Sequence, residues 1–367
     1  MTRAAILALG TALATMAVAG STFAADAVRL DARGQAIAKA EAAYKAPRLP
    51  FGQPDLQGYW SNATLTPMVR PSSFGTRGAY TPEEVAKLEK GVQEEVAEGN
   101  KPTDPNAPAE APKADAAKLR PEFAAAGGDV GGYNRGWLDP GASVMRVGGE
   151  PRTSLITTAN GQVPPRKAGG AGGGGFGRGL GSFDNAENRS LGERCIIGFG
   201  RNGGPPMFPN GFYNNDYNIV QTPNAVVIQV EMNHDVRVIR LNDQHRRDDV
   251  RPYFGDSIGH WEGDTLVVET TNIPQAQNFM GSWKNLKVTE RFRRVAKDRL
   301  RYAFTVEDPD TWAQPWGGEY EFGPMPGIIY EYACHEGNYA LPGMLGGARR
   351  QEKEAAGKGA AAPGGAE

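Results

Sequence analysis

The chain of 367 residues contains only two cysteines and four histidines, so few side chains are available for thiol or imidazole chemistry. It has no Cys-x-x-Cys-His pattern, which excludes the usual attachment sequence of a c-type haem. No two histidines stand two or four positions apart, so a histidine metal site would need ligands from separate segments. Any site built from these residues must therefore be assembled by the fold.

The chain also lacks a large excess of charge and, beyond its first residues, a long apolar run. Its 40 basic and 42 acidic side chains give a net charge of −2, which offers no electrostatic reason to expect a nucleic-acid partner. No later stretch approaches the ~18 consecutive apolar residues of a membrane-spanning helix, so we expect no membrane anchor. The oligomeric state is left open.

The N-terminus has the composition of an export signal. Arg3 precedes a run of small and apolar residues, and the Thr-Phe-Ala-Ala stretch at 22–25 suits signal peptidase. Cleavage near Ala24 or Ala25 would leave a periplasmic or secreted protein that binds a small-molecule substrate or ligand.

Glycine and proline are abundant, at 49 and 27 residues, which favours long loops and turn-rich β structure over helical bundles. A Pro/Ala-rich linker occupies residues 101–128, and a glycine tract at 168–182 lacks the Gly-Lys-Ser/Thr ending of a phosphate loop. Thr81, Pro82 and Glu84 predict the start of a helix with a capping box. The expected parts are a signal peptide at 1–25, an N-terminal extended and helical segment at 26–130, a β-rich core domain at 131–350 and a disordered tail at 351–367.

Short apolar runs separated by tight turns fill residues 215–335, without helical segments between them. They predict about eight strands in an antiparallel meander. A sheet of this size usually removes its edges by closing, so we expect a lipocalin-like barrel or a sandwich. The predicted fold class is mainly β, with one or two helices in an N-terminal extension.

Cys195 and Cys334 are the two cysteines, and they are 139 positions apart in the sequence. In an oxidising compartment such a pair is expected to form a disulfide. A nucleophilic cysteine would require a free thiol with a lowered pKa, which fits an exported protein less well.

The four histidines leave two kinds of site open. A metal site would gather His234, His260 and His335 around zinc or copper. An acid–base site needs only an imidazole and a carboxylate that face a cavity, and it needs no cofactor. His245 lies among charged residues and is expected to be a solvated loop residue.

The acid–base hypothesis assigns the acid and the base to His260 and His335. The other catalytic candidates are carboxylates and one further histidine near strand ends: Asp256, Glu307, Glu336 and His234, with Asp235 and Asp308 also considered. Aromatic side chains beside carboxylates are typical of a partly desolvated pocket. The predicted substrate-binding residues are Trp261, Trp312, Tyr332 and Tyr339.

A related prediction concerns charge inside the sheet. Glu290 and Arg291 are adjacent in a strand, so one of them must face inward. A buried arginine needs a carboxylate partner, and Glu307 on the neighbouring strand is the expected one.

Several longer strings, including LGERC at 191–195, GDSIGHWEGDTLVVETTN at 255–272 and IYEYACHEGNYAL at 329–341, resemble a large family of exported bacterial proteins abundant in soil and water. The similarity runs in order from about Asp55 to about residue 353. It implies an exported, disulfide-compatible, β-rich protein and carries over no catalytic residue.

These features favour an exported enzyme that acts on a small phenolic, terpenoid or sugar-derived molecule by histidine and carboxylate acid–base chemistry. A metal-independent lyase, isomerase or hydrolase would fit. The alternatives are a periplasmic lipocalin-like binding protein for an apolar ligand and a histidine-ligated metalloenzyme.

Overall fold

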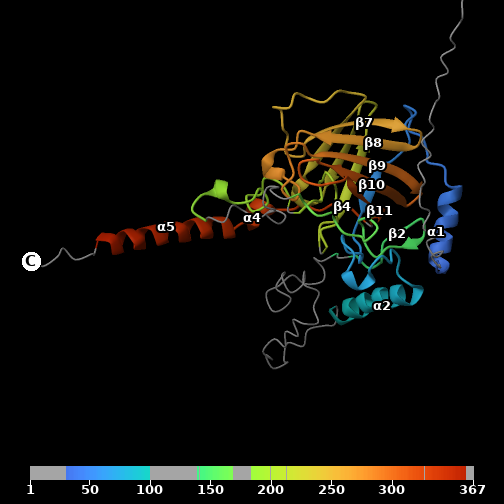
Figure 1. Ribbon diagram of the computed structural model, residues 1–367, viewed down its shortest axis with the longest axis horizontal. Helices are drawn as coiled ribbons and strands as arrows, with labels where there is room; N and C mark the ends of the chain where they lie inside the picture. The colour runs from blue at the N-terminus through green and yellow to red at the C-terminus, as the bar shows by residue number, and fades with distance from the viewer. Residues whose placement is uncertain are drawn as a thin grey trace, which may run out of the picture.

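The computed structural model describes residues 30–99, 139, 141–167, 183–198, 200–211, 213–325 and 327–360. The predicted signal peptide, the Pro/Ala-rich linker and the glycine tract lie outside the described residues. The described chain forms a β-barrel with helices around it (Figure 1).

Nine strands close the barrel in the order β1-β11-β10-β9-β8-β7-β6-β5-β4. This confirms the mainly β fold with a barrel, and eight of the strands lie between residues 216 and 324. The strands are β1 (Gly58–Ser61), β4 (Asp216–Gln221), β5 (Ala225–Val230), β6 (Val236–Leu241), β7 (Asp256–Glu262), β8 (Thr265–Thr271), β9 (Lys287–Ala296), β10 (Arg299–Glu307) and β11 (Trp316–Pro324).

The sheet departs from the predicted antiparallel meander at one pair, because β6 and β7 run parallel. Parallel neighbours need a long crossover connection rather than a hairpin, and residues 242–255 supply it. The barrel is therefore mixed.

Strand β1 closes the barrel from the N-terminal segment. It pairs with β4 through Gly58 and Ile219 and with β11 through Trp60 and Pro324. The predicted N-terminal segment and the predicted core domain therefore share one barrel.

Two helices precede the main run of strands, α1 (Ala32–Ala43) and α2 (Pro82–Gly99). The capping box of α2 is present: the Thr81 N–H donates to a Glu84 carboxylate oxygen at 2.8 Å, and the Glu84 N–H donates to the Thr81 hydroxyl at 3.2 Å. The remaining elements are short: β2 (Arg146–Val147), β3 (Glu150–Pro151), α4 (Cys334–Gly337) and the 3-10 helices η1 (Ser72–Phe74), η3 (Ala186–Asn188), η4 (Met232–His234) and η5 (Gln275–Gln277).

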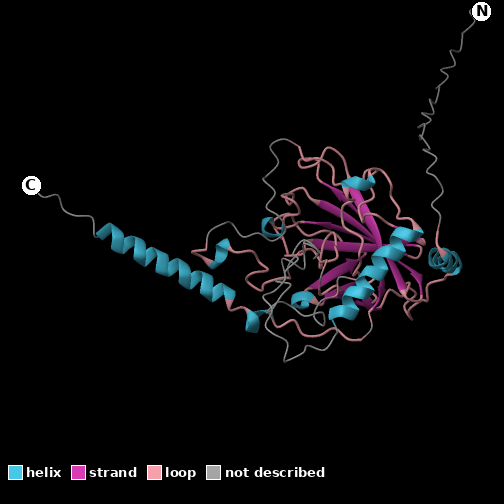
Figure 2. Cartoon of the chain, turned by 90° about the horizontal axis from the view of Figure 1, so that it is seen from below, coloured by secondary structure: helices cyan, strands magenta, loops and turns pink. Residues whose placement is uncertain are grey.

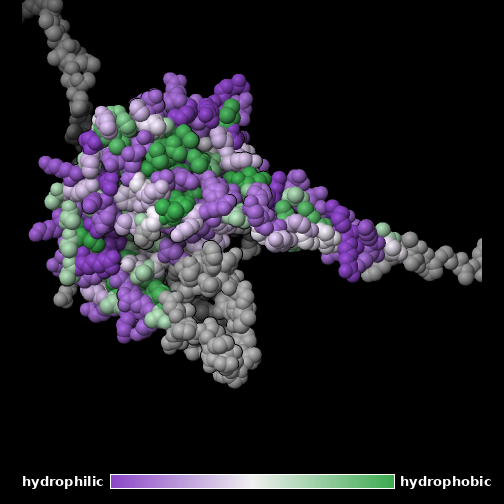
Figure 3. Space-filling view, turned by 180° about the vertical axis from the view of Figure 1, so that it is seen from behind, coloured by the Kyte–Doolittle hydropathy of each residue, from purple (hydrophilic) through white to green (hydrophobic). Residues whose placement is uncertain are grey.

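Helix α5 (Ala340–Ala360) projects away from the barrel in both ribbon views (Figures 1 and 2). Its last part overlaps the tail that composition predicts to be disordered, and residues 351–360 are helical instead. Alanine, glutamate, lysine and arginine are strong helix formers, and Arg350 pairs with Glu354 at 2.8 Å. Figure 3 shows apolar residues on this helix near the barrel and hydrophilic ones further out.

Aromatic side chains occupy the barrel interior, because alternate residues of each strand point inward. Tyr302 of β10 lies opposite Tyr320 of β11 and Phe292 of β9 across the ladders, and all three side chains are buried. Tyr217 and Phe322 pack edge to face, with ring centroids 5.1 Å apart. The inside of the barrel is a packed core.

One ion pair lies within this core. The side chain of Glu290 is 0% exposed and that of Arg237, from β6, is 2% exposed. The Arg237 guanidinium donates to both carboxylate oxygens, one of them at 3.0 Å, and the Tyr302 hydroxyl donates to the same carboxylate at 2.8 Å. Glu290 is thus the inward member of its predicted pair. Arg291 faces outward and bonds to Glu262, so the prediction of a buried arginine paired with Glu307 was wrong. Closure of the barrel brings Arg237 of β6 to Glu290 of β9 across the interior, although β7 and β8 lie between these strands in the sheet. The pairing of neighbouring hairpin strands alone does not predict this contact.

Candidate functional site

Residues 200–211, the plug segment, reach into one end of the barrel. The Met207 N–H donates to the Tyr302 hydroxyl at 2.9 Å, and the Tyr320 hydroxyl donates to the Met207 carbonyl at 2.9 Å. Met207 and Phe208 are buried among the core aromatics. The plug segment is therefore hydrogen-bonded to the same tyrosines that fill the barrel.

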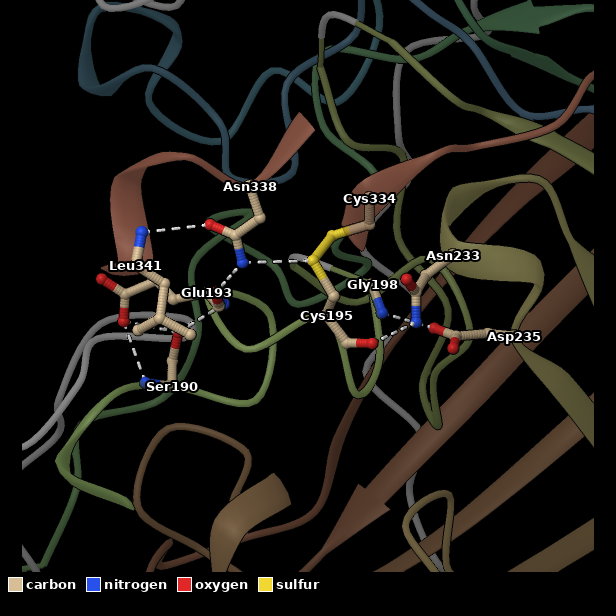
Figure 4. The surroundings of a disulfide bond; sticks show 9 residues. All are labelled: Ser190, Glu193, Cys195, Gly198, Asn233, Asp235, Cys334, Asn338 and Leu341. Carbon is tan, nitrogen blue, oxygen red and sulfur yellow. Dashed lines mark hydrogen bonds between the residues drawn. A yellow bond between two sulfur atoms is a disulfide. The ribbon is translucent and has the colours of Figure 1, made fainter. Parts of the chain in front are cut away.

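The predicted disulfide between Cys195 and Cys334 is present, with 5.7 Å between the two Cα atoms (Figure 4). It joins the loop before the plug segment to the chain after β11. Cys334 does not end a strand as expected but begins α4. Prolines 324 and 326 lack the N–H that a further β-ladder would need, so the strand stops at the first of them.

The turn between β5 and β6 lies against this disulfide (Figure 4). The Asn233 side-chain amide donates to the Cys195 carbonyl at 3.4 Å, and the Gly198 N–H donates to the Asp235 carboxylate at 2.7 Å. Cys195, Asn233 and His234 all have positive φ angles, of 54°, 59° and 52°. Left-handed backbone at non-glycine residues is uncommon, although Asn and His adopt it more readily than most. Asn233 and His234 of the turn adopt it next to Cys195, and four further residues do so elsewhere in the described chain.

A small recess of about 10 Å³, which is room for about one water molecule, opens between this turn and the plug segment. Glycine is needed in its wall, because a Cβ on Gly203 would lie 2.6 Å from the Phe254 ring. The recess is lined by Ile197, Gly198, Gly200, Arg201, Asn202, Gly203, Gly204, Asp235, Phe254 and Gln277.

Asp235 is the acidic residue of the recess lining, and it is 8% exposed. Burial raises the pKa of its carboxyl to about 6, while hydrogen bonds from Gly198 and Asn233 act against that rise. A carboxyl with a pKa near neutrality can both accept and return a proton under physiological conditions.

Arg201 is the basic residue of the recess lining, and it is 6% exposed. Its guanidinium donates to the Gln277 carbonyl at 3.1 Å and to the Pro205 carbonyl, and it lies 4.8 Å from the centre of the Phe279 ring. Among the described residues, no carboxylate forms an ion pair with it, and its Nε has no acceptor. Burial lowers its pKa to about 10, so the group remains protonated at neutral pH.

The histidine at 260 lies elsewhere, on the outer face of β7. His260 is exposed, and its Nε2 lies 3.3 Å from a Glu262 carboxylate oxygen. Glu262 in turn accepts a hydrogen bond from Arg291 at 2.8 Å. These three residues form a charged group on the barrel surface.

Asp256 and Glu307 belong to a second charged group on the outside of the barrel. Asp256 is buried beside Arg240, at 2.9 Å, and hydrogen bonds and nearby cations lower its pKa although burial opposes this. His245 is half-buried, with its two ring nitrogens 3.1 Å from Asp256 and 3.2 Å from Glu269. It was therefore wrong to expect a solvated loop residue. Lys287 connects Glu269, at 2.9 Å, with Glu307, at 3.7 Å.

The remaining predicted residues are dispersed. His335 and Glu336 are exposed on α4, and Tyr339 is 83% exposed. Trp312 is a fully buried core residue, packed against Trp316 with ring centroids 5.6 Å apart. Trp261 is partly buried against the same core.

Besides Asp256 and Glu307, which share the second charged group, the structure brings together Tyr332 and His234, because the Tyr332 N–H donates to the His234 Nε2 at 3.4 Å. The others lie on separate surfaces or in the core and do not form one site. Arg201 had no sequence signal except its position as a single cation in the glycine- and proline-rich stretch GFGRNGGPP.

Comparison of the chain with protein-family models, with curated proteins and with solved structures finds no match in any of the three. The family resemblance therefore stays a prediction. Within the described ranges, no three His, Cys, Asp or Glu side chains gather closely enough to hold a metal ion. No helix in the described part of the chain is both long and apolar enough to cross a membrane.

Proposed function

We propose that the protein is an exported enzyme that acts on a small organic molecule by acid–base chemistry beside the recess, with Asp235 as the group that transfers the proton. The observation that carries this proposal is a nearly buried carboxyl on the lining of a recess, held by the Gly198 N–H at 2.7 Å. The pKa of about 6 adds support, because such a carboxyl is mostly ionised at neutral pH yet readily protonated.

In this mechanism the Asp235 carboxylate accepts a proton from a C–H or O–H group of the substrate and returns it to another atom. The hydrogen bond from Gly198 and the neighbouring Asn233 amide orient the carboxyl. His234, the preceding residue, holds a contact to Tyr332 and positions the turn. A lyase, isomerase or hydrolase reaction on a phenolic, terpenoid or sugar-derived molecule would use this chemistry.

Two observations favour this function over ligand storage inside a lipocalin-like barrel. The barrel interior is occupied by aromatic side chains and by the Arg237–Glu290 pair. The left-handed residues Asn233 and His234, which directly precede Asp235, are a further support, since such backbone clusters at functional sites. The disulfide supports export, because such bonds persist in oxidising compartments.

The test is turnover by the purified protein on a panel of phenolic, terpenoid and sugar-derived compounds, followed by mass spectrometry. Asp235→Asn should lower kcat/KM by about 100-fold or more, which is the usual size of an acid–base contribution. Asp216→Asn is the matched control: burial also raises the pKa of Asp216 to about 6, but this residue does not line the recess. We expect the control to keep full turnover.

The pH dependence provides a second readout. In the wild type, kcat/KM should rise as pH increases through about 6 and then level off, because the base must be ionised. Full turnover by a folded Asp235→Asn variant would contradict the proposal. Recovery of one unmodified ligand from the native protein, with no turnover on the panel, would identify a binding protein instead.

A further inference from the structure

We infer that Asp216 and Glu231, called here the carboxyl pair, form a pH-sensitive anchor for the plug segment. The two groups share a proton while the plug segment is seated, and ionisation of both favours its opening. The inference goes beyond the proposed function and does not depend on turnover.

The first argument is that the sheet holds two carboxyl groups side by side. Tyr217 of β4 pairs with Val230 of β5, and the Glu231 N–H donates to the Asp216 carbonyl at 2.9 Å. Asp216 and Glu231 are therefore opposite each other across the ladder. Side chains in such positions lie on the same face of the sheet with Cβ atoms about 5 Å apart, and like charges there are destabilising.

The second argument is that the described residues provide this pair with no counter-charge. Both side chains are half-buried. The neighbours that act on them are the hydroxyl of Ser61, the amide of Asn214 and the carboxylate of Asp139, which has the same sign of charge. The hydroxyl group of Tyr217 is buried beside the pair and carries no positive charge.

Another pair of carboxyl groups on the barrel shows the contrast. Glu41 of α1 and Glu321 of β11 both accept hydrogen bonds from the Arg301 guanidinium, which lies between them. A cation holds those two groups together, whereas a proton can do so at the carboxyl pair. Burial raises the pKa of Asp216 to about 6, and burial together with the Asp216 charge raises the pKa of Glu231 to about 7.

The third argument is that the two residues before β4 connect the carboxyl pair to the plug segment. The Asn202 side-chain amide donates to the Asn214 carbonyl at 2.8 Å, and the Asn210 N–H donates to the Asn215 side-chain carbonyl at 2.7 Å. The Asn214 side chain also bonds to the Glu231 carboxyl. Repulsion within the carboxyl pair therefore acts on the chain that holds both parts of the plug segment.

The direction of the effect follows from linkage. Opening of the plug segment frees residues 214–216, so that the carboxyl pair separates and regains ordinary pKa values. The closed state binds more protons than the open one, and opening is therefore favoured as pH rises through about 6 to 7. A pKa difference of one unit corresponds to about a tenfold change in the equilibrium. Such a change in a rare opening leaves most molecules closed, so turnover is unaffected.

The first measurement is an NMR titration of the side-chain carboxyl carbons in the intact protein. We expect Glu231 to titrate near pH 7 in the wild type. In Asp216→Asn it should titrate lower by on the order of one pH unit, because the neighbouring negative charge is gone. Glu94→Gln, at an exposed glutamate of α2 that pairs with Lys90, is the control and should leave the Glu231 titration unchanged.

The second measurement is hydrogen exchange at about pH 5 and about pH 8, corrected for the intrinsic exchange rate. Protection of the Asn210 amide, which bonds to Asn215, should fall about tenfold between these conditions in the wild type and in Glu94→Gln. The Asp216→Asn/Glu231→Gln double variant keeps the shape of both side chains and should lose most of this fall. Barrel amides near Tyr302 should show no such difference between the variants.

Each outcome decides the inference separately from the proposed function. A Glu231 titration that is the same in the wild type and in Asp216→Asn would show that the two groups are not coupled and would overturn the inference. An equal fall in Asn210 protection in the wild type and the double variant would also overturn it, even with a coupled pair. Full turnover by Asp235→Asn would contradict the proposed function and leave this anchor standing.

Discussion

Two buried arginines in this protein lie in contrasting surroundings. Arg237, inside the barrel, meets both oxygens of Glu290 and also contacts the hydroxyl groups of Ser257 and Thr270. Arg201, in the plug segment, donates to two backbone carbonyls and stacks on Phe279, with no carboxylate paired to it among the described residues.

The two side chains therefore differ in how their charge is compensated. The Arg237 pair is complete without any ligand, so its role is to join β6 to β9 within the core. Within the described residues, Arg201 forms no ion pair with a carboxylate. It lines a recess that also contains Asp235, whose pKa is raised. Buried ionisable groups with shifted pKa values are enriched at functional sites, and Asp235 and Arg201 are two such groups, as are Asp216 and Glu321 on the barrel strands.

The largest expected effect comes from breaking the complete pair. Arg237→Met leaves the Glu290 carboxylate buried without a counter-charge, and we expect it to lower the free energy of unfolding by about 3–5 kcal/mol. Urea unfolding followed by tryptophan fluorescence measures this. Arg201→Met removes hydrogen bonds to two backbone carbonyls but leaves no carboxylate buried without its ion-pair partner, so we expect a smaller loss of about 1–3 kcal/mol. Equal and large losses in both variants would show that Arg201 has a structural partner and would remove the contrast.

A smaller effect is expected from removing the disulfide beside the recess. The Cys195→Ser/Cys334→Ser double variant should lose about 2–4 kcal/mol of stability, because the unfolded chain is no longer restricted by a closed loop. Hydrogen exchange should accelerate most at residues 195–204 and at the Asn233 turn, which the disulfide holds together. The barrel amides near Tyr302 should keep their order of protection. Uniform acceleration over barrel and plug segment alike would contradict a local role.

The smallest expected effect is the pH dependence of stability caused by Asp235. Its pKa is about 6 in the folded protein and lower in the unfolded chain, so the folded state binds more protons between these values. The free energy of unfolding should therefore fall as pH rises from about 4 to about 6, by on the order of 2 kcal/mol from this residue. Asp235→Asn should reduce the slope by this amount, while the part that comes from Asp216 and other carboxyls with raised pKa values remains. Asp249→Asn, at an exposed carboxylate, should leave the slope unchanged. An identical slope in the wild type and in Asp235→Asn would show that folding does not raise the pKa of Asp235.

Much of the local structure could be predicted because the signals are short in range. The capping box at Thr81 and Glu84 is contained in four residues, and strand alternation repeats every second residue. The candidate site was harder to predict. Sequence reasoning selected histidines by their rarity, but His260 faces solvent on β7 and His335 faces solvent on α4. Rarity of a residue type carries no information about which way its side chain points.

The sequence by itself determined the strand-rich character, the helix start at Thr81 and the pairing of Cys195 with Cys334, since two cysteines allow one intramolecular bond. Only the tertiary structure decided that β6 runs parallel to β7, that Arg237 meets Glu290, and that Arg201 and Asp235 line one recess. The reason is physical: periodicity and capping act between neighbours along the chain. Partners of buried charges, in contrast, are set by how a closed barrel brings distant strands and loops together.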